Sequence, residues 1–177
     1  MTTYIVLLRG INVGGKNRLP MKELRAVLEG LGASDVRTYI QSGNVVMQHG
    51  EADTRALEEA ISSAIEAAHG FAPRTLVLTA ADLRKAAELN PFPEAVDEPK
   101  TLHLSFLATP SESPDLAKLE EVAKASERFH LGDGCFYLHA PEGIGRSKLA
   151  ERVERVLGVP ATARNWRTVS KLLEMIG

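Results

Sequence analysis

Residues 9–20 form a loop whose residue types suit the binding of an anion. The segment reads Arg-Gly-Ile-Asn-Val-Gly-Gly-Lys-Asn-Arg-Leu-Pro, and we call it the glycine loop. Glycines let the backbone turn tightly, and the cations Arg9, Lys16 and Arg18 can hold an anion. The loop approaches the phosphate-loop pattern, but Asn17 occupies the position where that pattern needs a magnesium-binding Ser or Thr. The loop therefore indicates where a ligand binds, and not which ligand.

A second group of candidate residues surrounds the only tryptophan of the chain. Arg164, Trp166 and Arg167 lie at an expected helix start, for which Asn165 is the expected N-cap. A helix start with cations and an exposed aromatic ring can hold a phosphate or stack on a base. The competing explanation is that Trp166 fills a seam between domains and that the cations surround it.

The elements that would position these residues follow from the hydrophobic pattern. Ser42-Gly43 is favourable hairpin chemistry between two strand-like segments, and Asp53 or Thr54 can cap the next helix. The elements expected in the first half are strand 4–9, helix 20–31, strands 36–41 and 44–48, helix 54–68 and strand 75–78. This order, β-α-β-β-α-β, is that of the ferredoxin-like unit.

The same order returns in the second half of the chain. Its expected elements are strand 102–107, helix 114–125, strands 128–131 and 135–139, a helix after Ser147 and strand 161–164. Further helices are expected from Thr79 and Asn165. We predict an α+β fold of two ferredoxin-like subdomains in tandem, with additional helices after each. The predicted boundaries are 1–90 for the first subdomain with its connecting helix, 91–100 for a linker, and 101–177 for the second subdomain with its terminal helix.

The expected topology brings the glycine loop close to the turn Gln41-Ser42-Gly43-Asn44. In a ferredoxin-like unit the first and second strands run the same way with the third between them, so the connections after both strands share one end. The two segments would lie about two strand spacings apart, roughly 10 Å. The ligand-binding residues predicted on the three segments are Arg9, Asn12, Gly14, Gly15, Lys16, Asn17, Arg18, Ser42, Asn44, Arg164, Trp166 and Arg167.

A purely structural role is the alternative for the glycine loop. Gly and Asn turn the chain, exposed cations are solvated, and Ser42-Gly43-Asn44 can be a plain hairpin. The corresponding loop of the second half, residues 108–113, has no cation and no paired glycines. The fold alone therefore does not demand the composition of the glycine loop.

Composition excludes several classes of protein. A net charge of −2, from 21 cations and 23 anions, argues against a strongly basic nucleic-acid binder and a membrane-surface protein. The single Cys135 forms no internal disulfide, and without a leader or a long apolar run we expect a cytoplasmic protein. His103, Ser105, Tyr137 and His139 could share a sheet face, but no carboxylate or second Cys accompanies them. We expect no metal and no cofactor.

Three strings of residues resemble a known family. They are Leu8 to Asn17, Tyr39 to Val45 and Thr162 to Val169. Together they are similar to the bacterial family called domain of unknown function (DUF) 1697, and the resemblance covers essentially the whole chain. It implies a tandem of α+β ferredoxin-like subdomains, and it implies no activity.

Three functions are consistent with the sequence. The first is binding of a small anionic, phosphorylated ligand by the glycine loop and the Ser42-Gly43-Asn44 turn, with the Trp166 helix as a further wall. The second is binding of single-stranded nucleic acid, because ferredoxin-like sheets can present stacking surfaces, although aromatic residues make up only 5% of the chain. The third is an enzyme acting on a phosphorylated metabolite, in which Arg9 or Lys16 steadies developing charge. The oligomeric state stays open.

Overall fold

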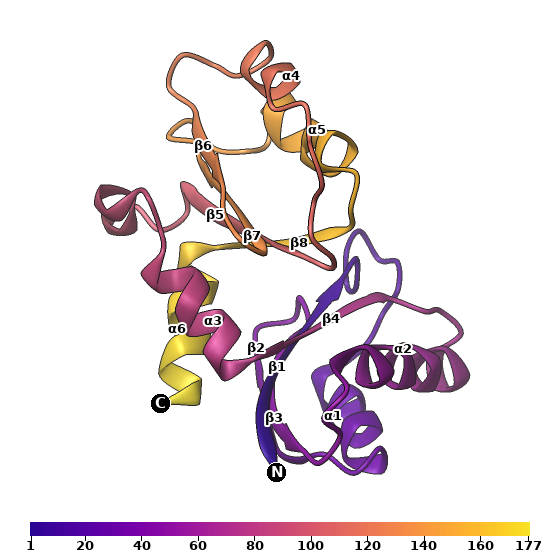
Figure 1. Cartoon of the computed structure of the whole chain (residues 1–177). Coiled ribbons are helices and arrows are strands. Elements are labelled where there is room, and N and C mark those ends of the chain that lie inside the picture. The colour runs from indigo at the N-terminus through magenta and orange to yellow at the C-terminus, as the bar shows by residue number, and fades with distance from the viewer. The chain divides into compact units, whose positions relative to one another are not determined.

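The computed structural model describes all residues from Met1 to Gly177, which form two compact units (Figure 1). The first unit comprises Met1–Arg84 together with Lys171–Gly177, and the second comprises Lys85–Ser170. Each unit contains one four-stranded antiparallel sheet. The predicted α+β fold of two ferredoxin-like subdomains is confirmed.

The first unit follows the order predicted from the sequence. Its elements are β1 (Thr2–Arg9), α1 (Met21–Gly30), β2 (Ser34–Tyr39), β3 (Asn44–His49), α2 (Thr54–His69), β4 (Arg74–Thr79) and the beginning of α3 (Ala80–Glu88). The strand order is β2-β3-β1-β4, and α1 and α2 cover one face of the sheet (Figure 1). As predicted, β1 and β2 run the same way with β3 between them.

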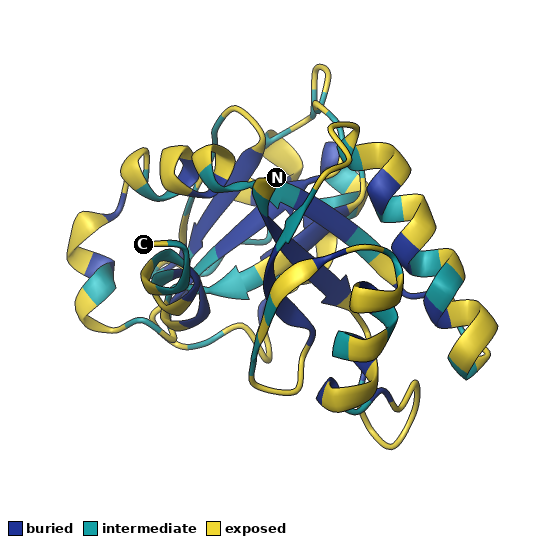
Figure 2. Ribbon diagram, turned by 90° about the horizontal axis from the view of Figure 1, so that it is seen from below, coloured by how far each residue is buried: buried dark blue, intermediate teal, exposed yellow.

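The central strand β1 is buried on both faces. Five consecutive residues, Tyr4 to Leu8, are each at most 2% exposed. Since successive side chains of a strand point to opposite faces, both sides of β1 must be covered. Figure 2 shows this pattern, with the central strands largely buried and each helix exposed along one side. The strand that leads into the glycine loop is therefore firmly held.

Side chains cap the helices of the first unit where the sequence predicted caps. Asp53 accepts hydrogen bonds from the N–H groups of Arg55 and Ala56 at the start of α2. Thr79 and Asp82 bond to each other's backbone N–H at the start of α3, at 3.0 Å in both directions. Asp82 is thus a capping residue, because its carboxylate satisfies a backbone donor at the start of the helix.

The second unit repeats the topology of the first. Its elements are the end of α3, a 3-10 helix η1 (Pro93–Asp97), β5 (Leu102–Leu107), α4 (Ala117–Glu120), β6 (Arg128–Leu131), β7 (Cys135–His139), α5 (Lys148–Leu157), β8 (Ala161–Asn165) and the start of α6 (Trp166–Ile176). The strand order β6-β7-β5-β8 matches that of the first sheet. Helices α4 and α5 pack on one face of this sheet through a cluster that includes Leu119, Leu149 and Phe136.

Helix α4 is shorter than the predicted helix 114–125. It spans four residues, has no side-chain N-cap, and buries only Leu119 fully. Beyond it, the Glu127 carboxylate accepts the N–H of Lys124 at 2.8 Å. A helix without a cap and with one buried anchor gains little from packing, so the chain leaves helical geometry early.

The segment predicted to be a linker, residues 91–100, contains η1 and packs within the second unit. The Phe92 side chain is 7% exposed, and the Arg128 guanidinium lies 4.8 Å from the centre of its ring. Arg128 also forms an ion pair with Glu94. These contacts attach the segment to the edge of the second sheet, so the compact units divide before it, between Arg84 and Lys85.

His103 and Ser105 do not share a sheet face with Tyr137 and His139. In the register of β5 and β7, Leu104 lies opposite Tyr137, which leaves His103 and Ser105 on the other face. His139 lies two residues after Tyr137 on β7, so its side chain points to the same face, because side chains alternate along a strand. The expectation of one shared face was wrong, since a register difference of one residue reverses the face.

Two classes of feature are absent from the fold. No helix has the length and apolar character needed to cross a bilayer, and the longest, α2, has 16 residues. No group of three or more His, Cys, Asp or Glu side chains is placed to hold a metal ion.

Candidate functional site

The glycine loop and the turn before β3 meet at one end of the first sheet, as the topology predicted. The N–H of Leu8 donates to the Gly43 carbonyl at 2.9 Å. The Asn12 side chain donates to the Gln41 carbonyl at 2.7 Å. The two segments are therefore in direct contact.

Asn12 organises the glycine loop through its side chain. Its Nδ2 donates to the Leu19 carbonyl at 2.9 Å, and its Oδ1 accepts the N–H of Leu19 at 2.8 Å. Its backbone has φ +53°, a left-handed conformation that Asn tolerates better than most residues. The amide of Asn12 thus closes the base of the loop.

The other amides also bind the chain itself. Asn17 Nδ2 donates to the Gly10 carbonyl at 3.0 Å across the loop. Asn44 is fully buried, and its Nδ2 donates to the Tyr39 carbonyl at 3.2 Å and to Ser42 Oγ at 2.9 Å. These neutral side chains, which the sequence suggested as ligand contacts, shape the loop and the turn. A ligand would meet a site that they organise.

The tip of the loop is a tight turn open to solvent. Lys16 N–H donates to the Val13 carbonyl at 3.0 Å, and Gly14 and Gly15 have φ of +57° and +74°. A Cβ added at either glycine would meet no heavy atom within 4 Å. The glycines are therefore needed for backbone conformation, and the space around them can admit a ligand.

Four cations lie on or beside the loop. Lys16 and Arg18 are exposed, and Arg9 is the last residue of β1. The register of β1 and β4 places Arg74 directly opposite Arg9. Burial, and then the positive charge of Arg74, lower the pKa of Arg9. Like charges in opposed positions repel each other, which agrees with the lowered pKa of Arg9. The sequence did not single out Arg74.

Ile40, in the turn beside the loop, has a strained backbone. This β-branched residue has φ +50° and is 51% exposed. The left-handed region costs non-glycine residues about 1–2 kcal/mol, and little burial offsets that cost here.

Ile40→Asn is therefore expected to raise the free energy of unfolding by about 1 kcal/mol, measured by urea denaturation. Val13→Asn is the control, because Val13 is also exposed, at 64%, and is not among the residues with positive φ. It should change stability little. An equal effect of both substitutions would contradict backbone strain as the cause.

The second group of predicted residues lies at the start of α6, in the second unit. Asn165 is the cap, as predicted, because its Oδ1 accepts the N–H of Thr168 at 3.0 Å. The N–H of Trp166, a half-buried residue, donates to the Pro99 carbonyl at 3.1 Å. Burial lowers the pKa of Arg164 to about 10. Arg167 is exposed and lines a pocket.

A family model described as protein of unknown function (DUF1697) matches residues 1–137. The chain belongs to the DUF1697 family. The matched residues include the glycine loop, the turn before β3 and most of the second sheet, and they end before α5, β8 and α6. The Trp166 segment thus lies outside the part of this DUF1697 protein that the family model covers.

A solved structure resembles this DUF1697 protein over its whole length. It is that of the conserved bacterial protein SP0830 from Streptococcus pneumoniae, with 28% sequence identity and a TM-score of 0.68. The similarity covers 99% of each chain. No curated protein matches the sequence.

Proposed function

We propose that this DUF1697 protein binds a small phosphorylated ligand at the glycine loop. The observation that carries the proposal is the opposition of Arg9 and Arg74 at the base of the loop. A phosphate group would relieve the repulsion between these two guanidinium groups. Arginine also suits this ligand because its planar N–H groups can bind two phosphate oxygens at once.

The loop supplies further groups of the same chemistry. Lys16 and Arg18 are exposed on it, and the open backbone turn at Gly14 and Gly15 leaves room for a ligand to approach the main chain. Successive N–H groups in a glycine-rich turn favour anions. Because the asparagines already bind the loop's own backbone, binding requires little ordering of the chain, which lowers its entropic cost.

Binding is better supported than catalysis. The glycine loop contains no Asp, Glu, His or Cys, so it carries no evident general base or thiol nucleophile. Single-stranded nucleic acid is the other candidate, since its phosphates offer the same charge. The affinity for single-stranded nucleic acid should fall steeply with rising salt concentration.

The test is thermal stabilisation by nucleotides, sugar phosphates, inorganic anions and short oligonucleotides. A ligand at about a hundredfold excess over its Kd should stabilise the wild-type protein by about 2–3 kcal/mol. The double substitution Arg9→Ala and Lys16→Ala should abolish that stabilisation. A control, Arg152→Ala with Arg155→Ala, removes the same charge from exposed positions on α5.

Two results would contradict the proposal. One is stabilisation that survives in the Arg9 and Lys16 variant. The other is an equal loss in the α5 control, which would mean that net charge alone drives binding. A response confined to oligonucleotides and abolished by salt would instead favour nucleic acid as the ligand.

A further inference from the structure

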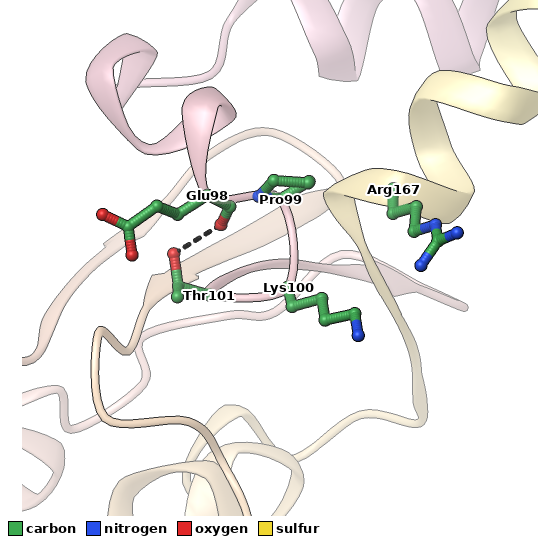
Figure 3. Close-up of a pocket in the computed structure, with 5 residues that line it drawn as sticks. All are labelled: Glu98, Pro99, Lys100, Thr101 and Arg167. Carbon is green, nitrogen blue, oxygen red and sulfur yellow. Dashed lines mark hydrogen bonds between the residues drawn. The ribbon is translucent and has the colours of Figure 1, made fainter.

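A pocket of about 400 Å³ lies in the second unit, and none of the residues that line it belongs to the glycine loop. Glu98, Pro99, Lys100, Thr101 and Arg167 line it (Figure 3). Its volume falls within the range of small-molecule sites, and its wall is mostly apolar. It is distinct from the site of the proposed function.

Backbone hydrogen bonds hold the walls of this pocket. The Glu98 carbonyl accepts both the N–H of Thr101, at 2.9 Å, and its hydroxyl, at 2.7 Å, which closes a tight turn. The Pro99 carbonyl accepts the N–H of Trp166 at 3.1 Å, which ties this turn to the start of α6. The Thr101 carbonyl accepts the N–H of Ala140 at 2.8 Å, which joins it to the sheet. The pocket is therefore formed before any ligand arrives.

The charged groups of the pocket are arranged for an anion. Figure 3 shows the Lys100 ammonium and the Arg167 guanidinium on the same side, while the Glu98 carboxylate points away from them. Both cations are exposed, and neither forms an ion pair. An anion between them would gain two favourable charge interactions without competing with a carboxylate.

The N-terminus of α6 does not supply the binding groups of this pocket. Asn165 and Pro99 already accept the N–H groups of Thr168 and Trp166 in its first turn. The binding groups are the side chains of Lys100 and Arg167, and the apolar surface is Pro99 with the aliphatic stems of the two cations.

We propose that this pocket binds a small organic phosphate, with the phosphate between Lys100 and Arg167 and a short apolar body against Pro99. The two cations match a group that carries up to two negative charges near pH 7. The apolar wall distinguishes such a ligand from inorganic phosphate, which has nothing to pack against it.

The test is NMR titration of the full chain with phenyl phosphate, inorganic phosphate and benzyl alcohol as probes. Phenyl phosphate should shift the amide signals of Lys100, Thr101 and Arg167 in a saturable manner. Lys100→Ala with Arg167→Ala should raise its Kd at least tenfold. Arg167→Lys should retain most of the binding, because it keeps the charge. Inorganic phosphate should bind at least tenfold more weakly, and benzyl alcohol should cause no saturable shift.

The variants of the glycine loop separate this proposal from the first one. Arg9→Ala with Lys16→Ala should leave the phenyl phosphate shifts at Thr101 unchanged, whether or not the glycine loop binds a ligand. The proposal is wrong if no saturable shift occurs at the pocket amides or if the Lys100 and Arg167 variant binds as tightly as the wild type. If inorganic phosphate binds as tightly as phenyl phosphate, the proposed apolar contact with Pro99 is wrong. If benzyl alcohol causes a saturable shift, the proposed role of the two cations is wrong.

Discussion

Gly43→Ala is expected to lower the free energy of unfolding by about 2–5 kcal/mol. Gly43 has φ +83°, which costs an alanine about 1–2 kcal/mol. An added Cβ would also lie 2.6 Å from the Cβ of Leu8 and 3.1 Å from Cδ1 of Ile11. Both side chains are at most 1% exposed, so neither can move aside easily, and overpacking of this kind costs about 1–3 kcal/mol.

The second unit offers a matched control in Gly134→Ala. The Gly134 carbonyl accepts the N–H of Leu107 just as the Gly43 carbonyl accepts that of Leu8, and φ is +75°. An added Cβ at Gly134 would meet no heavy atom within 4 Å. The control should therefore lose only about 1–2 kcal/mol by urea denaturation. Equal losses in the two variants would show that the contact with Leu8 does not matter.

Asn12→Ala is expected to lower the free energy of unfolding by about 3–4 kcal/mol, because it removes hydrogen bonds and places alanine in a left-handed conformation that asparagine tolerates better. The substitution removes three hydrogen bonds, two with Leu19 and one with Gln41, each worth about 1 kcal/mol. It also leaves the partly buried backbone groups of Leu19 without their partner. Hydrogen exchange at the Leu19 amide should become faster, since the side-chain oxygen that protects it is gone.

Asn17→Ala is the control for this prediction. Asn17 has almost the same conformation, with φ +52°, but its side chain makes a single bond, to the Gly10 carbonyl. Its loss should cost about 1–2 kcal/mol, which combines one hydrogen bond with the left-handed backbone. If Asn12→Ala is no more damaging than Asn17→Ala, the backbone conformation and not the side-chain bonds explains the effect.

The fold could be predicted from the sequence because its local signals agree with one another. Strand β5 and strand β6 have the predicted bounds, and the residues expected to cap α2 and α6 do so. Helix α4 and the segment at 91–100 were less predictable. Their structure depends on the contacts of Leu119, Glu127 and Arg128 with residues distant in sequence, which no local pattern reveals.

The candidate site could be located from the sequence, but its chemistry could not be assigned residue by residue. The position of the glycine loop and the Gln41 turn at the same end of the sheet follows from topology alone, whereas their direct contact does not. The roles of Asn12 and Asn44 cannot be derived from topology, because an amide that binds the backbone and an amide that binds a ligand look alike in a sequence. Arg74 became relevant only through its register with Arg9, and Lys100 only through the pocket that it lines.

The division of the first unit into two stretches of chain affects how it is made on the ribosome. Arg84 Nη2 donates to the Gly177 carbonyl at 3.0 Å, so the last residues of the two stretches meet in the folded protein. The whole second unit, Lys85–Ser170, is synthesised between them. At about 5–20 residues per second the nascent first unit waits several seconds for its final piece. During that interval all four strands of its sheet are present but the last part of α6 is missing, and it is then that this protein most needs protection from aggregation.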